Sequence, residues 1–273
     1  MTDYLSNQNP HPRDARIAFD PIPHVYTVDN DASIKYTSVT TWVHSHFEHF
    51  DADAIIDGMM RSKRWPENKY YGMTKDEIKA AWDTNRDQAA SAGTDMHYNI
   101  ELYYNHVTPL SELPDTPELT YFRKFAADYA PSLRPYRTEW MIFHEEARLS
   151  GSVDMVYENI DPTTGAPDGT LSIYDWKRCK EIIKADPFGK FAKTEALSHL
   201  PDTNYWHYCL QLNTYKAILQ EKYGKVVTDL YLVCLHPNNK NGSYLRIKVA
   251  DLQEDVCALI RDMAVSQADK QCE

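Results

Sequence analysis

The segment LSIYDWKRCK, residues 171–180, changes from apolar to charged within a few positions. Its apolar half reads as a buried strand, which ends by presenting Asp175, Trp176 and Lys177. Because alternate side chains of a strand share a face, Asp175 and Lys177 point together while Trp176 points the other way. A carboxylate and an ammonium group are therefore expected side by side at the end of one strand.

Two further acids can reach the same face of the predicted sheet. Asp154 lies on the preceding strand, and Glu139 lies on the strand before that. Converging carboxylates repel one another unless a cation lies between them, and their oxygens bind hard divalent ions such as Mg²⁺ or Mn²⁺. A lysine beside such ions can help to deprotonate a water molecule and can offset charge developing on a phosphoryl oxygen. This combination indicates metal-assisted hydrolysis of a phosphodiester.

Each motif taken alone also has a purely structural explanation. An Asp-x-Lys pair is commonly a surface ion pair, and GSVD, residues 151–154, is compatible with a strand entered through a glycine bulge. The two motifs become more specific when they follow one another on neighbouring strands in this order.

GSVD followed by IYDWK, residues 173–177, resembles the PD-(D/E)XK nuclease superfamily. Three further motifs resemble its RecB-like exonuclease branch: Gly-Thr-x-x-His in AGTDMHYNIE (92–101), the acid of TEW (138–140), and Gln-x-x-x-Tyr in QLNTY (211–215). The resemblance is strong over residues 93–215.

The resemblance implies a role for each matching residue. His97, Asp154 and Asp175 would bind metal, namely one or two Mg²⁺ or Mn²⁺ ions. The backbone carbonyl of Trp176 would be a further ligand, and Lys177 would be the catalytic lysine.

Three other matching residues have more open roles. Glu139 matches less firmly because the spacing of this acid varies in the family, so it would serve the catalytic site either at the metal or by orienting the site or the DNA. Gln211 and Tyr215 lie one helical turn apart on one face and would support the lysine or contact the nucleic-acid backbone.

The cysteines show no C-x-x-C pair and read as free thiols of a reducing compartment. Several relatives hold an iron–sulfur cluster with one cysteine well ahead of the core. In this chain every cysteine follows Asp175, so no cluster is expected; the five are Cys179, Cys209, Cys234, Cys257 and Cys272.

The formal charge of -11 argues against a uniformly cationic nucleic-acid coat but not against a local basic groove. Six basic residues and two acids lie between Lys177 and Lys193. Arg178 and Lys180 are expected to begin a track that receives phosphate, although a solvated face is the commoner meaning of such a run.

Several other polar residues allow two interpretations. His97 could be an ordinary packed imidazole, and Glu101 reads as a solvated acid or as a neighbour of the ligands. His44, His46 and His49 suggest zinc, but positions 44 and 46 diverge by about 200° on a helix, so surface histidines are preferred. A second basic cluster could line a nucleic-acid channel, with an aromatic ring to stack on bases, or could be a solvated helix end; it comprises Arg61, Lys63, Arg64 and Lys69, with Trp65 or Tyr70 as the ring.

Hydrophobic periodicity predicts the elements that must position these residues. The first dozen residues read as a loose tail, followed by a short strand pair within 16–29. Helices are expected within 37–64, from a Thr74 capping box to about 106 with a break or kink at Gly93, and from a Thr116 cap to about 130.

The second half of the chain changes to strand periodicity. A three-stranded meander is predicted within 134–177, then a helix ending at Gly224, a hairpin with its turn at Asn241-Gly242, and a terminal helix from about Asp251. The expected fold is α/β, with a restriction-endonuclease-like core of a central mixed sheet flanked by helices and an N-terminal helical elaboration. We expect one domain over 1–273, mainly helical to 130 and catalytic from 131.

The sequence thus predicts a Mg²⁺- or Mn²⁺-dependent deoxyribonuclease, preferentially an exonuclease, whose partner is DNA. Alternatives are a structure-selective endonuclease on flaps, junctions or breaks, and a non-catalytic nucleic-acid-binding module. There is no apolar signal core and no run of 18 apolar residues, so a soluble intracellular protein without a membrane partner is expected.

Overall fold

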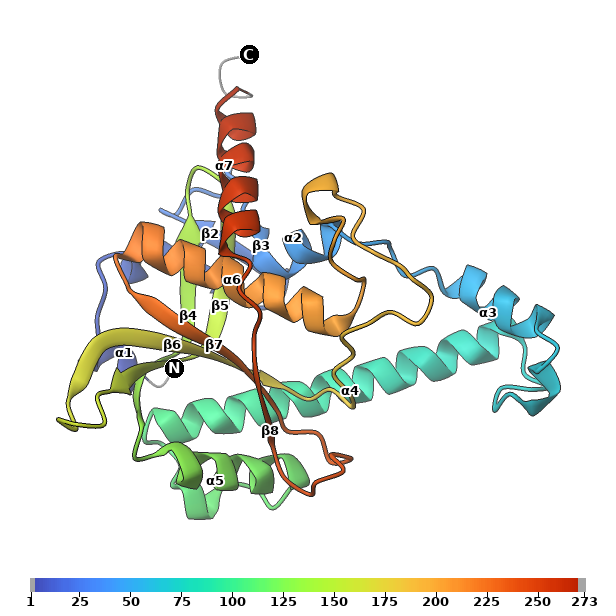
Figure 1. Ribbon diagram of the computed structural model, residues 1–273, viewed down its shortest axis with the longest axis horizontal. Helices are drawn as coiled ribbons and strands as arrows, with labels where there is room; N and C mark the ends of the chain where they lie inside the picture. The colour runs from blue at the N-terminus through green and yellow to red at the C-terminus, as the bar shows by residue number, and fades with distance from the viewer. Residues whose placement is uncertain (1–2, 270–273) are drawn as a thin grey trace.

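The computed structural model describes residues 3–269 and has an α/β fold built on a mixed six-stranded sheet (Figure 1). A separate antiparallel pair lies beside it. The sheet strands are β3 (Thr37–Ser38), β4 (Leu133–His144), β5 (Leu149–Ile160), β6 (Pro167–Lys177), β7 (Val227–Cys234) and β8 (Leu245–Lys248), and the pair is β1 (Ile17–Asp20) with β2 (Val25–Val28).

Three consecutive antiparallel strands, β4, β5 and β6, form the predicted meander, and among the described strands β4 pairs with β5 alone. Helix α6 (Asn204–Tyr223) then connects β6 to β7, which runs parallel to β6, and β8 returns antiparallel to β7. The sheet is therefore mixed, and the expected order of strands and helices is confirmed.

Helices cover both faces of this sheet (Figure 1). One apolar core joins α2 (Val39–Ser45), α6 and α7 (Gln253–Asp269) to the sheet, and a second core, rich in aromatic rings, joins α4 (Lys75–Tyr104) and α5 (Pro117–Tyr129) to it. Strand β6 contributes to both: Leu171 and Ile173 enter the first core, whereas Tyr174 and Trp176 enter the second. The prediction that Trp176 packs away from Asp175 is confirmed.

The helix ends follow the predicted capping chemistry. Ser38 caps α2 by accepting a hydrogen bond from the Thr41 N–H, and Thr74 and Glu77 form the expected capping box of α4. Gly224 ends α6 with a φ of 61°, a left-handed conformation that glycine adopts without strain.

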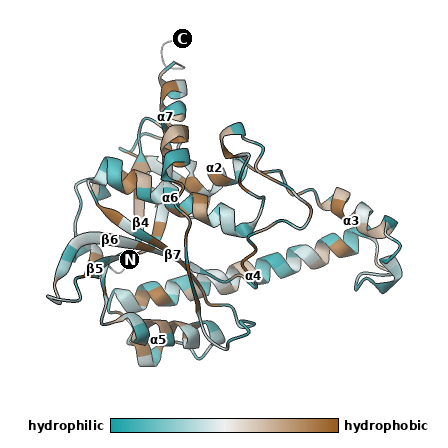
Figure 2. Cartoon of the chain, in the orientation of Figure 1, coloured by the Kyte–Doolittle hydropathy of each residue, from teal (hydrophilic) through white to brown (hydrophobic). Residues whose placement is uncertain are grey.

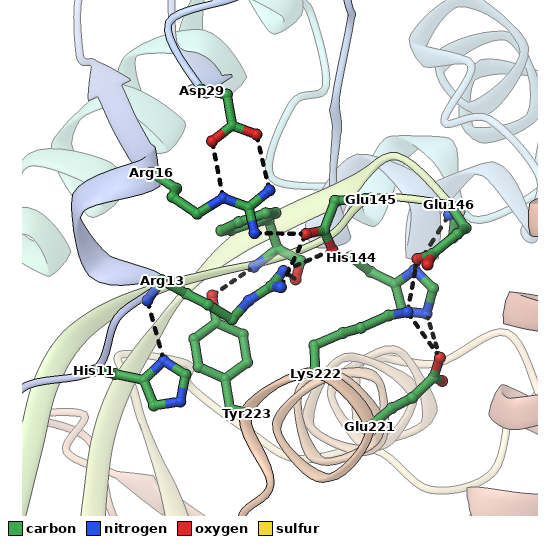
Figure 3. A network of polar contacts seen from close by, with 12 residues as sticks. His11, Arg13, Arg16, Asp29, His144, Glu145, Glu146, Glu221, Lys222 and Tyr223 are labelled. Atoms are coloured by element: carbon green, nitrogen blue, oxygen red, sulfur yellow. Dashed lines mark hydrogen bonds and ion pairs between the residues drawn. The ribbon is translucent and has the colours of Figure 1, made fainter.

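The N-terminal residues are not the loose tail that their composition suggested. Residues Tyr4–Gln8 form α1, and Leu5 is buried. Arg13 makes a bidentate ion pair with Glu145, at 2.7 and 2.9 Å, and its guanidinium lies 3.9 Å from the centre of the Phe143 ring (Figure 3). The tail prediction was wrong because long-range contacts, which local sequence does not reveal, fix the first dozen residues: the Asn9 side chain donates to the Tyr136 carbonyl of β4 at 2.9 Å.

Two predicted backbone details were also wrong. Helix α4 continues without a break through Gly93, since a glycine within a long helix costs only about 1 kcal/mol and the flanking turns outweigh it. Asn241-Gly242 does not form a two-residue hairpin turn: the Gly242 N–H bonds to the Asn239 carbonyl within a longer connection.

The first half of α4 stands clear of the sheet (Figure 1). Residues 83–91 are exposed on all sides, and Figure 2 shows this stretch as predominantly hydrophilic. Helix α3 (Ala52–Arg61) packs near its start, where Ile56 and Ile78 are fully buried. Among the residues described, no helix combines the length and apolar character needed to cross a membrane.

Candidate active site

Strand register brings the three predicted acids into one row. Thr138 pairs with Met155 and Trp140 with Val153, so Glu139 lies opposite Asp154 on neighbouring strands. Met155 pairs with Tyr174, and one step further along this register Asp154 lies opposite Asp175.

The backbone is irregular where this row crosses the sheet. Glu139 has a φ of +44°, in the left-handed region that non-glycine residues seldom occupy. On β5, Val153 and Val156 both enter the α6 core although they are three residues apart, so the alternation of faces slips by one residue around Asp154. The slip ends the β5–β6 pairing at Met155, and the Trp176 N–H donates instead to the Asp154 carboxylate at 2.9 Å.

His97 completes a compact group of possible metal ligands. Its Nδ1 lies 3.6 Å from Glu139 Oε1 and 3.7 Å from Asp154 Oδ2, and ligand atoms of the three residues all lie within 4.8 Å of one another. The side chains of His97 and Glu139 are 30% and 32% exposed, so the group is open to solvent on one side. Carboxylate oxygens suit Mg²⁺ and Mn²⁺, and an imidazole nitrogen is a ligand for transition metals.

Trp176 lies close to this group through its backbone. Its carbonyl oxygen is 2.9 Å from His97 Nε2, so Nε2 carries the proton that it donates and Nδ1 faces the carboxylates. A backbone oxygen that accepts from the far ring nitrogen orients a metal-ligating histidine. The structure thus places the Trp176 oxygen against His97, whereas the resemblance implied a direct ligand.

The charges of the group depend strongly on one another. Burial, reinforced by Asp175 and Glu139, raises the pKa of Asp154 to about 7. Burial disfavours the charged ring of His97, but the carboxylates of Asp154 and Glu139 outweigh it and raise its pKa to about 9. Without a metal the imidazolium is therefore the counterion of the acids, and a metal ion that binds there releases its proton.

Asp175 contacts Lys177 and lies outside the group of possible metal ligands. Its buried carboxylate lies 2.7 Å from Lys177 Nζ, as the shared face of β6 predicts, and it is not part of the group within 4.8 Å. Burial opposes the Lys177 ammonium, but Asp175 and Asp154 raise the pKa of Lys177 above its ordinary range. Lys177 is therefore a cation at neutral pH.

The Gln-x-x-x-Tyr pair of α6 lies directly behind the lysine. Gln211 Oε1 accepts from Lys177 Nζ at 3.4 Å, and Gln211 Nε2 donates to the Tyr215 hydroxyl at 3.2 Å. A Cβ added at Gly151 would lie 2.8 Å from the Tyr215 ring, so only glycine lets β5 approach this helix so closely. Both residues are buried, Gln211 contacts the lysine and Tyr215 contacts Gln211, which favours the supporting role among their two predicted ones.

The predicted phosphate track is only partly available. Lys180 is exposed, but the Arg178 guanidinium pairs with the Glu118 carboxylate at 2.7 Å.

In the second basic cluster, the Tyr70 hydroxyl accepts a hydrogen bond from Trp82 Nε1 at 2.8 Å. Glu101 is partly buried, and burial together with Glu139 raises its pKa.

One of the three predicted surface histidines is buried. His44 and His49 are exposed, but His46 is 8% exposed and its Nδ1 bonds to Thr194 Oγ1 at 2.8 Å. The surface prediction was wrong for His46 because α2 turns this residue toward the loop that precedes α6. The free cysteines are Cys179, Cys209, Cys234 and Cys257, and Cys272 lies outside the described residues.

Sequence reasoning missed two side chains beside the ligands. Ser152 Oγ donates to Glu139 Oε2 at 3.0 Å, and the Tyr208 ring lies 4.5 Å from Lys177 Nζ. Sequence spacing could have suggested both residues. Ser152 is two residues before Asp154 on the same strand, and Tyr208 is three residues before Gln211 on one helix face.

Comparison with protein-family models gave no match, and no curated protein sequence matched the chain.

Proposed function

We propose that this protein is a metal-dependent nuclease that hydrolyses phosphodiester bonds in DNA, acting as an exonuclease. One observation carries the proposal: neighbouring strands align Glu139, Asp154 and Asp175 in a row, with His97 at one side and Lys177 at the other. The finer fold assignment, a restriction-endonuclease-like core, belongs to the same proposal and is supported by the meander followed by α6 and the parallel strand β7.

The ligand group fits a divalent cation. Glu139, Asp154 and His97 present their donor atoms within 4.8 Å of one another. Burial and then repulsion from Asp175 raise the pKa of Asp154, and a cation would relieve the repulsion. A divalent ion bound there would polarise the phosphodiester and lower the pKa of an attacking water molecule.

The remaining residues act on the substrate and on each other. Lys177 supplies a fixed positive charge that offsets negative charge on a phosphoryl oxygen, and Asp175 and Gln211 hold its ammonium group. Ser152 holds the Glu139 carboxylate by donating a hydrogen bond to Oε2, the oxygen other than the one that faces His97.

Digestion of end-labelled oligonucleotides tests the proposal directly. Linear and circular DNA, single- and double-stranded, would be incubated with Mg²⁺ or Mn²⁺ and in parallel with EDTA. We expect metal-dependent loss of linear substrates and survival of closed circles. Cleavage of circles would instead support the endonuclease alternative, and no cleavage under any condition would reject a nuclease.

Two variants link activity to the site. Lys177→Ala and Asp154→Asn should each lower the rate about a hundred- to thousandfold, the usual cost of removing one charge-stabilising group. Lys240→Ala, on the exposed β7–β8 connection, is the matched control and should keep the parent rate. If the Lys177→Ala variant digested DNA at the parent rate, Lys177 would have no catalytic role.

A further inference from the structure

The Lys177 ammonium group has a third neighbour besides Asp175 and Gln211. Its Nζ lies 4.5 Å from the centre of the Tyr208 ring, a distance at which a cation is attracted to the face of an aromatic ring. We propose that Tyr208 is a positioning residue that holds the Lys177 ammonium in place for the reaction. This inference rests on the proposed function.

Helix α6 presents Tyr208 and Gln211 to the lysine together. The two residues are three positions apart and Tyr215 is four further on, so all three lie on one side of the helix. Tyr208 is partly buried and packs against the core between α6 and the sheet. The ring is therefore fixed by the fold and offers the lysine a rigid surface.

The two polar contacts do not by themselves fix the position of a lysine. Its four-carbon chain has several rotatable bonds, and the contact to Gln211 is long, at 3.4 Å. The pair with Asp175, at 2.7 Å, restrains the ammonium from one strand only. Contact with the ring restrains it from the helix as well, which lowers the entropy lost when phosphate arrives.

Two other lysine–tyrosine contacts involve lysines that lie in water. Lys184 is 4.4 Å from the Tyr205 ring and Lys69 is 4.6 Å from the Tyr70 ring, and both lysines are exposed. The Lys177 side chain is only 18% exposed. Because attraction between a cation and a ring strengthens when water is excluded, Tyr208 contributes more than the rings beside these exposed lysines do.

Two substitutions separate the ring from its hydroxyl. Tyr208→Phe keeps the ring face and should keep the parent kcat, whereas Tyr208→Leu removes the face and should lower kcat about tenfold with KM for DNA unchanged. Tyr205→Leu is the matched control, since it removes a lysine-contacting ring from the same helix away from Lys177, and it should keep the parent kcat. Thermal unfolding of each variant shows whether it is folded.

A second measurement does not require the protein to digest DNA. Acylation of the Lys177 amine by an N-hydroxysuccinimide ester, followed by peptide mass spectrometry, should proceed about threefold faster or more in Tyr208→Leu than in the parent or Tyr208→Phe. If the parent digests no substrate, the proposed function fails while faster acylation in Tyr208→Leu still supports the contact. The inference is overturned if Tyr208→Leu matches the parent in acylation, or if Tyr208→Phe is as defective as Tyr208→Leu.

Discussion

Two groups of charged side chains flank strand β4, and they are organised in opposite ways. The site group brings three carboxylates together with Lys177 and a histidine that must take up a proton to balance them. A second group, near the N-terminus, pairs each of its acids with an arginine, and Figure 3 shows Arg16 with Asp29 and Arg13 with Glu145. We call this second group the docking network; it comprises Arg13, Asp14, Arg16, Asp29, Arg137 and Glu145.

The difference appears in the pKa values of two partly buried acids, Asp14 and Asp154. Burial opposes the charge of Asp14, but hydrogen bonds from Arg137 and Trp140 lower its pKa. Burial also opposes the charge of Asp154, and neighbouring acids raise its pKa further, to about 7. The docking network pairs its acids with arginines as folded, whereas the site group balances its acids by protonating His97 or by binding an additional cation.

The largest expected effect comes from breaking the docking network. Arg137→Ala would leave Asp14 without the guanidinium that lies 2.8 Å away, and we expect a loss of about 3 kcal/mol in the free energy of unfolding, measured by urea denaturation. Arg134→Ala, which removes an exposed pair with Glu158, should cost about 0.5 kcal/mol or less. Equal losses in both variants would mean that the docking network adds no special stability.

The buried His46, which has no acidic partner among the residues that the structure describes, provides a second test, in which stability is measured as a function of pH. Burial and nearby Lys193 lower the pKa of His46 to about 4, below its unfolded value near 6.5. The unfolded chain therefore binds more protons between pH 6.5 and 4, so stability falls as the pH is lowered through this window, by about 3 kcal/mol at most. In His46→Gln this part of the pH dependence should disappear, as followed by unfolding at each pH; an unchanged slope would exclude His46 as its source.

At the site, neutralising an acid should stabilise the metal-free protein. Asp154→Asn keeps an oxygen for the Trp176 N–H but removes a charge that burial and neighbouring acids disfavour, so we expect a gain of about 2 kcal/mol at pH 8 in EDTA. The opposite is expected for Asp14→Asn, which loses its arginine pairing. Destabilisation by both variants would show that the two groups do not differ in this way.

The smallest expected effect concerns the backbone of Glu139. Its φ of +44° suits asparagine better than alanine, so Glu139→Asn should be more stable than Glu139→Ala by about 1 kcal/mol. Both variants lack the carboxylate, so charge is matched in the comparison. Equal midpoints in thermal unfolding would show that this conformation stores no strain.

Much of the site's framework could be predicted because it depends on local rules. Period-two alternation placed Asp175 with Lys177 and Trp176 behind them, and cap and stop residues located the helices that carry His97 and Gln211. These features need only neighbouring residues in the sequence.

The features that could not be predicted depend on contacts between distant segments. Arg13 meets Glu145 across more than a hundred residues, and β3 adds only Thr37 and Ser38 to the edge of β5. The slip of alternation at Asp154 follows from the packing of the sheet against α6, so strand periodicity gave no sign of it. Gly93 shows the reverse case, where a local rule favoured a break and the surrounding helix prevailed.

Helix α4 gives His97 an unusual mechanical position. Met96, Ile100 and Tyr104 anchor the end of the helix in the aromatic core, while residues 83–91 touch little else. About 33 Å of helix separates Lys75 from His97. If α4 tilted by about 5° about its buried end, Lys75 would move by about 3 Å, whereas His97, close to that end, would turn almost in place. Because His97 lies close to the buried end of α4, its imidazole would stay almost in place when the start of the helix, where α3 packs, moves.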